Sequence, residues 1–151
     1  MSPGTKTALI VAACLGLVGA LVAGAGWYVY SKKDQWLAEG QAIHEEGLRA
    51  GASVAESECV RDSMARYRKD PSVLGAIASR VWLAGCLETS RPESDFCTGV
   101  PNEDAILDSA TWRVGICSRY GIEGDSTCPN VPAEVQGYCH GAARAQKRSA
   151  T

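Results

Sequence analysis

The sequence predicts an all-α protein in which a single N-terminal transmembrane helix precedes a small, disulfide-stapled helical domain of about four to five helices. Three observations support this fold class: an uncharged apolar run near the N-terminus, apolar residues at helical spacing after it, and six cysteines within residues 34–151. After Tyr30, no stretch of the sequence alternates β-branched or aromatic residues with polar ones, so no strand is expected.

The apolar run covers residues 8–30, ALIVAACLGLVGALVAGAGWYVY, and its 23 positions contain no charged residue. Since about 20 apolar helical residues cross the hydrocarbon core of a bilayer, the run is long enough to be a transmembrane helix. It ends in aromatic residues, among them Trp27 and Tyr30, which Lys32 and Lys33 follow. This order is typical of a membrane interface. We therefore expect an uncleaved membrane anchor.

Small residues recur every four positions along the run and would form one stripe on a helix: Ala8, Ala12, Gly16, Ala20 and Gly24. Small side chains allow two helix backbones to approach closely in lipid. We expect the stripe to be a packing face, with another transmembrane protein or a second copy of this chain as its partner.

Two other interpretations of the N-terminal segment are possible besides an uncleaved anchor: cleavage as a signal peptide and lipidation. The tripeptide Ala23-Gly24-Ala25 resembles a signal-peptide cleavage site, and cleavage there would remove residues 1–25. Val11 to Cys14 resembles a lipidation motif, but too little apolar sequence precedes Cys14 and too much follows it. We prefer the anchor because the apolar run is long and continues into aromatic residues.

Two rules disagree about the orientation of the chain. Two lysines, Lys32 and Lys33, follow the run, whereas one lysine, Lys6, and the terminal amine precede it, and this weakly favours a cytoplasmic C-terminal domain. An even number of cysteines in a small domain favours an oxidising compartment instead. Because the charge difference is small, we give the cysteines more weight. We expect the N-terminus in the cytoplasm and the C-terminal domain in a periplasm-like, extracytoplasmic compartment.

The sequence divides into five segments with different expected roles. They are a short N-terminal tail (1–7), the transmembrane helix (8–30), a juxtamembrane helical stalk (31–52), the disulfide-stapled helical domain (53–146) and a disordered tail (147–151). The basic residues near the C-terminus, among them Arg144, are expected at a helix end, where cations complement the helix dipole.

Within the domain, apolar residues at i, i+3 and i+4 predict four helices: residues 53–69, 71–86, 101–120 and a last helix from Pro132 onward. Loops are expected over 88–101 and 124–131. On the second of these helices we expect the buried face to contain Leu74, Ile77, Ala78, Val81, Trp82 and Gly85. On the third we expect it to contain Ile106, Leu107, Ala110, Val114 and Cys117.

An internal repeat of 31 residues covers two of these helices and the loops that follow them. The matching pairs are Cys86 and Cys117, Cys97 and Cys128, Val100 and Val131, Pro101 and Pro132, and Glu103 and Glu134. Each unit is a helix, a cysteine, a loop, a second cysteine and a Val-Pro pair before the next helix. Two copies are too few to predict a solenoid, since such arrays usually need about three repeats or more.

We expect six cysteines to form structural disulfides: Cys59, Cys86, Cys97, Cys117, Cys128 and Cys139. Spacing alone does not fix their pairing. If the two repeat units are equivalent, Cys86 pairs with Cys97 and Cys117 with Cys128, which leaves Cys59 for Cys139. Their wide spacing, without a C-x-x-C pair, favours this structural role over zinc binding or redox chemistry.

Charge and motifs argue against several functions. Residues 34–151 hold 17 acidic and 12 basic residues, which disfavours nucleic-acid binding. There is no nucleophile elbow, phosphate loop, zinc-protease motif or dinucleotide fingerprint. His44 and His140 are expected to be ordinary helix residues, and the acidic residues between 93 and 108 lack the pattern of a calcium loop. We therefore expect no catalytic residue, no metal and no cofactor.

Three functions fit these expectations. The leading one is a non-catalytic, single-pass membrane protein that serves as an accessory or assembly subunit of a membrane protein complex, through its transmembrane helix and its extracytoplasmic domain. The alternative is a membrane-tethered binding domain for a small ligand or an envelope component, with a pocket between the repeated helices. The third is a thiol-active redox protein.

Overall fold

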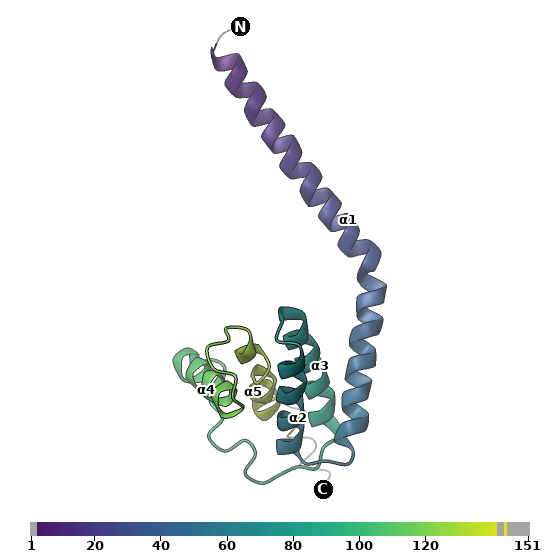
Figure 1. Cartoon of the computed structure of the whole chain (residues 1–151), viewed down its shortest axis with the longest axis vertical. Helices are drawn as coiled ribbons and strands as arrows, with labels where there is room; N and C mark the ends of the chain where they lie inside the picture. The colour runs from purple at the N-terminus through teal and green to yellow at the C-terminus, as the bar shows by residue number, and fades with distance from the viewer. Residues whose placement is uncertain (1–2, 142–143, 145–151) are drawn as a thin grey trace. The chain divides into compact units, whose positions relative to one another are not determined.

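The computed structural model describes residues 3–141 and Arg144, with side chains for all of these except residues 3–14 and 29. The elements in chain order are α1 (Pro3–Gly51), α2 (Glu56–Lys69), α3 (Val73–Thr89), α4 (Ile106–Arg119), the 3-10 helix η1 (Cys128–Asn130) and α5 (Ala133–His140) (Figure 1). Among the described residues, β-structure is limited to an isolated bridge between Ala55 and Arg91. The all-α prediction is confirmed.

Helix α1 contains the run expected to be transmembrane and almost all of the expected stalk. Across the part of the chain that the structure describes, no helix combines the length and the apolarity needed to cross a membrane. Ala8 and Ala12 of the small-residue stripe lie outside the described side chains, whereas Gly16, Ala20 and Gly24 are exposed. The transmembrane helix and its stripe stay predictions.

The chain forms two compact units, one that ends at Glu39 and one that begins at Gly40. The second unit contains the last turns of α1 together with α2, α3, α4 and α5. The last turns of α1, which lie in the expected stalk, therefore belong to the second compact unit.

Three glycines allow the end of α1 to approach the backbone of α3. A Cβ atom on Gly47 would lie 2.2 Å from the carbonyl oxygen of Trp82, and one on Gly51 would lie 2.2 Å from that of Cys86. On α3, a Cβ atom on Gly85 would lie 2.3 Å from a carbonyl oxygen of α1. No side chain fits at such distances, so the two helices pack directly through their backbones.

Helices α2 and α3 pack against each other and supply much of the core (Figure 1). The short connection of residues 70–72 makes them antiparallel, and the Ser63 hydroxyl donates a hydrogen bond of 3.0 Å to the carbonyl oxygen of Ser79 between them. The fully buried side chains of this pair include Cys59, Met64, Tyr67, Leu83, Cys86 and Leu87. Residues of η1 and α5 cover the remaining side of the core, among them Val135 and Tyr138.

Three disulfides join Cys59 to Cys86, Cys97 to Cys139 and Cys117 to Cys128. The expected Cys117–Cys128 pair is confirmed, whereas the expected pairs Cys86–Cys97 and Cys59–Cys139 are wrong. Antiparallel packing brings Cys59 of α2 beside Cys86 of α3, both fully buried. The loop after α3 then runs to α5, where Cys97 meets Cys139. The repeat in the sequence therefore does not extend to its disulfides.

The buried faces of α3 and α4 agree only in part with those expected, since Trp82, Gly85 and Cys117 are buried as expected. Leu74, Ile77, Ile106, Leu107, Ala110 and Val114 are exposed. Helix α4 begins at Ile106 instead of residue 101, and it turns Ser109, Ile116 and Cys117 inward. The Cys117–Cys128 disulfide and the hydrogen bonds of Ser109 hold this face against η1 and α5, which leaves the more apolar face of α4 outside.

Candidate functional site

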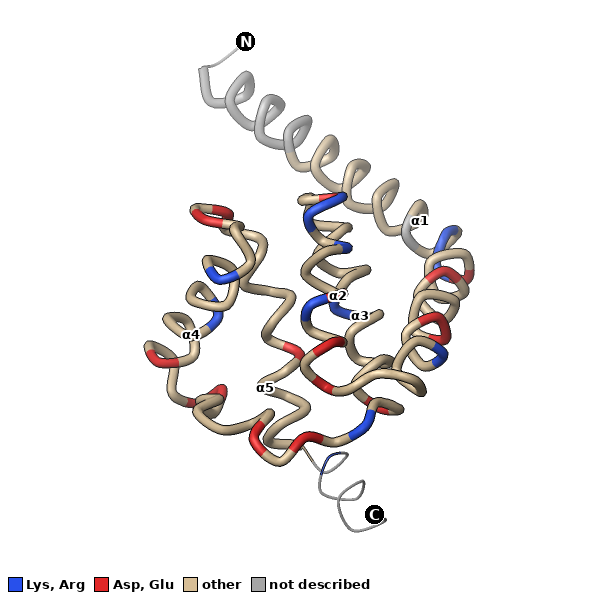
Figure 2. The backbone as a smooth tube through the Cα atoms, turned by 60° about the horizontal axis from the view of Figure 1, so that its bottom comes forward, with Lys and Arg blue, Asp and Glu red and all other residues tan. Residues whose placement is uncertain are grey.

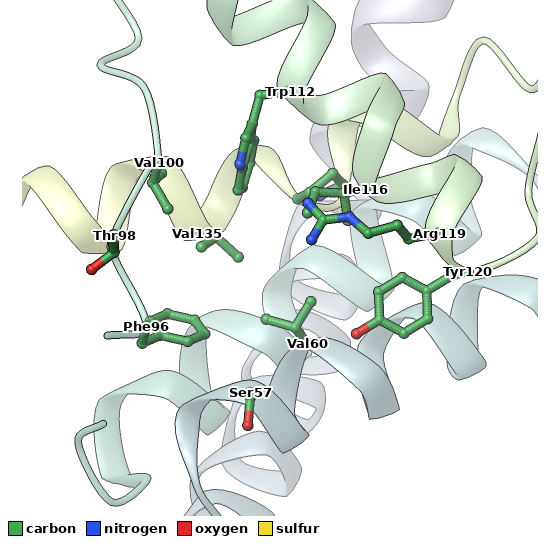
Figure 3. A pocket seen from close by; sticks show the side chains of 11 residues that line it. Ser57, Val60, Phe96, Thr98, Val100, Trp112, Ile116, Arg119, Tyr120 and Val135 are labelled. Atoms are coloured by element: carbon green, nitrogen blue, oxygen red, sulfur yellow. The ribbon is translucent and has the colours of Figure 1, made fainter. Parts of the chain in front are cut away.

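A pocket of about 290 Å³ opens between α2, the loop of residues 91–105, α4 and the start of α5 (Figure 3). Most of its wall is apolar, formed by Val60, Phe96, Val100, Trp112, Ile116, Pro132 and Val135. Four side chains add polar groups, those of Ser57, Thr98, Arg119 and Tyr120. All of these residues belong to the compact domain that begins at Gly40.

The loop that forms one wall is fixed at several points. Cys97 is bonded to Cys139 of α5, and the ring of Phe96 meets that of Tyr138 edge-on, with centroids 6.2 Å apart. Gly99 has a φ of 76°, a left-handed conformation that glycine adopts without a steric penalty and that turns the chain after Cys97. The loop wall is therefore held by covalent and packing contacts to α5.

The start of the same loop is attached to the N-terminus of α2 through Glu93. Its carboxylate accepts hydrogen bonds from the Ser57 backbone amide at 2.6 Å and from the Ser57 hydroxyl at 3.2 Å. A carboxylate is favourable at this position because it satisfies a free amide of the first helical turn and faces the positive end of the helix dipole. The rim of the pocket at Ser57 is held in place by this contact.

A buried ion pair lies behind the loop. The Glu56 carboxylate accepts two hydrogen bonds of 3.2 Å from the Arg144 guanidinium, one of 2.7 Å from the Tyr138 hydroxyl and one of 2.8 Å from the backbone amide of Glu93. Burial alone would raise the pKa of Glu56, but these donors together hold it below its ordinary value. The side chain of Glu56 is fully buried and that of Arg144 is 7 % exposed.

Arg144 does not have the role expected from the sequence. The sequence predicts that Arg144 is a cation at a helix end, where it would complement the helix dipole. Instead, it pairs with Glu56, donates a hydrogen bond of 2.9 Å to the carbonyl oxygen of Glu93 and lies over the rings of Phe96 and Tyr138. Arg144 therefore ties the C-terminal part of the domain to α2 and to the pocket loop.

The opposite wall of the pocket is positioned by Gln136 of α5. Its side-chain amide donates hydrogen bonds of 3.0 Å to the carbonyl oxygen of Pro101 and of 3.0 Å to the Ser109 hydroxyl of α4. Its amide oxygen accepts a hydrogen bond from Arg113, also on α4. Because Gln136 is fully buried, these bonds fix the rotation of α4 against α5. That rotation turns Trp112 and Ile116 toward the pocket.

Arg119 and Tyr120, at the C-terminal end of α4, form the polar end of the pocket. Burial raises the pKa of Tyr120, and the neighbouring charges of Arg119 and Arg61 partly oppose that increase. The Tyr120 hydroxyl therefore keeps its proton at neutral pH. Figure 3 shows both side chains extending from the end of α4 toward the apolar residues of the wall.

The histidines and the acidic residues form no metal site in the part of the chain that is described: no group of three or more potential ligands occurs there. His44 lies 3.0 Å from the Glu88 carboxylate, and His140 lies 3.2 Å from the carbonyl oxygen of Val100. The six cysteines of the domain are all bonded in pairs, while the side chain of Cys14 lies outside the described residues.

Arg144 stands out in the sequence only as a cation near the C-terminus, and nothing in the sequence marks Arg119, Tyr120, Glu56 or Gln136 as part of a site. They come from four separate segments and follow no motif, so spacing along the chain does not reveal them. One available signal was Trp112, a large aromatic residue that the expected buried face of its helix did not include. A helix with apolar residues on two faces indicates either a buried helix or a second surface to be covered.

No family model, curated protein or solved structure matches this chain.

Proposed function

We propose that this protein is a membrane-tethered, non-catalytic binding domain whose pocket receives a small ligand or a component of the envelope. The pocket itself carries the proposal. Ligand sites are concave and mostly apolar, with a few placed polar groups, and span roughly 300–1,000 Å³. This pocket has that composition, and its volume lies near the lower end of that range.

The domain is built in a way that suits a preformed site. Two disulfides, Cys97–Cys139 and Cys117–Cys128, lie in the segments that form its walls. The Glu56–Arg144 pair and the Gln136 hydrogen bonds hold the loop and α4 in place. Because little has to become ordered when a ligand enters such a pocket, binding loses little conformational entropy.

The proposed tether is the run of residues 8–30 in α1. Its described large apolar side chains are all exposed: Leu15, Leu17, Val18, Leu21, Val22, Trp27, Tyr28 and Tyr30. A contiguous apolar surface of this kind is unfavourable in water and would be covered by lipid or by another helix. We place the N-terminus in the cytoplasm and the domain outside it, because disulfides persist in oxidising compartments.

The compartment is tested by labelling the thiols of intact cells with a membrane-permeant alkylating reagent before lysis, with or without a reductant. We expect the cysteines of the domain to stay unlabelled until they are reduced. Labelling without a reductant would place the domain in a reducing compartment and overturn the proposed topology.

Ligand binding is tested with the full chain in lipid nanodiscs and a library of fluorinated fragments, followed by ¹⁹F NMR. Val100→Trp fills the pocket, because Figure 3 shows the Val100 side chain pointing into it. The matched control is Val114→Trp, on the exposed face of α4. We expect fragments that bind the parent chain and Val114→Trp but not Val100→Trp. If every bound fragment is insensitive to Val100→Trp, the pocket is not the binding site.

A second candidate function is an accessory or assembly subunit of a membrane complex. It is favoured by the exposed apolar face of α4, where Ile106 is 78 % and Leu107 is 82 % exposed. Isolated exposed apolar residues are common, but a group on one helix face suits contact with a protein partner. The proposed partner is another transmembrane protein or a second copy of this chain, in contact with the small-residue stripe as well.

The second candidate is tested by gentle detergent extraction and native mass measurement. We expect a complex heavier than one chain. The double variant Gly16→Leu/Ala20→Leu should dissociate it, because larger side chains would separate the helix backbones. Leu17→Ala/Leu21→Ala, outside the stripe, is the control. A mass that is unchanged by the first pair of substitutions would argue against the stripe as the docking face.

A further inference from the structure

The chemistry of the pocket narrows the class of ligand. Arg119 is the one charged residue among the described residues that line it. Within the described part of the chain, no carboxylate lies within ion-pair distance of Arg119, whereas Arg66 pairs with Glu46 at 2.7 Å and Arg80 with Glu134 at 2.9 Å. The Arg119 guanidinium is therefore available to an anion that enters the pocket.

The surroundings of Arg119 support an anionic group at this position. Tyr120 offers a protonated hydroxyl as a second donor. The charge of Asp62 helps to raise the pKa of Tyr120. Asp62 forms an ion pair of 3.0 Å with Arg61, so its negative charge is already compensated. Figure 2 shows acidic positions before α4 and at its start, basic ones farther along the helix, and acidic ones again in the loop that follows it. Among the described lining residues, the positive charge at this end of the pocket therefore comes from Arg119.

The remainder of the wall suits an aromatic ring. Trp112 and Phe96 present two aromatic surfaces to the pocket, and Val60, Val100 and Val135 add aliphatic side chains to its wall. Aromatic side chains favour an aromatic partner in offset or edge-on contact. A volume of about 290 Å³ suits a small molecule.

We propose that the ligand of this pocket is a small aryl carboxylate, with its carboxylate bound by Arg119 and Tyr120 and its ring against Trp112 and Phe96. This inference rests on the proposed binding function and specifies the ligand class of the same site. A guanidinium and a carboxylate form charge-assisted hydrogen bonds in a fork geometry that a neutral amide does not reproduce.

The test compares three probes of the same shape and different charge on the full chain in nanodiscs. They are 3-(4-fluorophenyl)propionate, its neutral amide and 3-(4-fluorophenyl)propylamine, titrated by ¹⁹F NMR. We expect the carboxylate to bind about fivefold to tenfold more tightly than the amide, and the amine most weakly. The advantage of the carboxylate should decrease with added salt.

Substitutions test whether Arg119 causes the preference for the carboxylate over the amide. Arg119→Gln should abolish the difference between carboxylate and amide while the amide still binds. The control Arg68→Gln, at an exposed residue of α2 outside the pocket, should keep the difference. Tyr120→Phe should reduce the difference in affinity between the carboxylate and the amide without abolishing it.

The outcomes separate the two proposals. Equal binding of carboxylate and amide to the parent chain, with loss of both in Val100→Trp, would leave the binding site in place and overturn the anionic ligand. A preference for the amine would overturn it as well. If none of the three probes binds, the aryl carboxylate is excluded, and the fragment experiment with Val100→Trp then decides whether the pocket binds another class of ligand.

Discussion

The carboxylate of Glu56 and the guanidinium of Arg144 form a buried ion pair, with two hydrogen bonds of 3.2 Å between residues that are 88 positions apart. The pair joins the first turn of α2 to the C-terminal part of the domain and lies against the pocket loop through Glu93. A buried charge is costly to leave without its partner, so the contact also makes the domain sensitive to the loss of either residue.

Glu56→Ala should lower the free energy of unfolding by about 3–5 kcal/mol, because it leaves the Arg144 charge buried and unpaired. Urea denaturation with the disulfides intact measures the change. The control is Glu45→Ala, whose exposed carboxylate lies 3.9 Å from Arg49 and should contribute at most about 0.5 kcal/mol. The double variant Glu56→Met/Arg144→Met should be more stable than the sum of the single losses predicts.

The same pair predicts an acid-sensitive domain. The pKa of Glu56 in the folded state lies below its ordinary value of 4.5, so the ionised form stabilises the fold. That contribution is fully present above the ordinary pKa and is lost as the pH falls through the lower folded pKa. Unfolding free energies measured between about pH 6 and pH 2 should decrease with a smaller slope in Glu56→Gln than in the parent chain. Equal slopes would mean that other carboxylates dominate the acid response.

Gly47→Ala should destabilise the domain by about 1–3 kcal/mol, because the new methyl group would collide with the carbonyl oxygen of Trp82 on α3. Gly40→Ala in the same helix is the matched control, since nothing lies within 4 Å of a Cβ atom there. It should stabilise the helix by about 0.5–1 kcal/mol through its higher helix propensity. If both substitutions stabilise the chain, α1 does not pack on α3 as closely as described.

The all-α class, the helices of the domain and the Cys117–Cys128 disulfide could be predicted from apolar spacing and from the internal repeat. The other two disulfides could not. The repeat relates loops that are similar in sequence, but Cys97 is directed to Cys139 by the packing of its loop on α5, which is a long-range contact. Helical spacing likewise predicts that Ile106, Leu107 and Val114 of α4 are buried, but hydrogen bonds from Gln136 help to turn the face that contains Ser109 inward instead.

The ion pair that supports the pocket loop could not be predicted from the sequence, for a similar reason. Glu56 and Arg144 look like ordinary surface residues, since an acid in a first helical turn and a base near a C-terminus are both favourable in water. Their burial depends on the position of the loop at Glu93 and on Tyr138, which come together only in the folded domain.

Removal of the Cys97–Cys139 disulfide by a double alanine substitution should lower the free energy of unfolding by about 4 kcal/mol. The bond closes a loop of 42 residues, and the entropy that a disulfide removes from the unfolded chain grows with loop length. Removing Cys117–Cys128, with a separation of 11 residues, should cost about 3 kcal/mol. Peptide mapping without reduction should recover Cys59 linked to Cys86, and a Cys86–Cys97 peptide would contradict the connectivity.

Leu107→Ser should change the free energy of unfolding by no more than about 0.5 kcal/mol, because this side chain is 82 % exposed on α4. Leu83→Ala, in the core on α3, should cost about 2–5 kcal/mol. A loss of that size for Leu107→Ser would mean that α4 is rotated, with its more apolar face inward. Trp112 and Arg119 would then turn away from α5, and the pocket that they line would not exist, so this one substitution tests the geometry on which ligand binding depends.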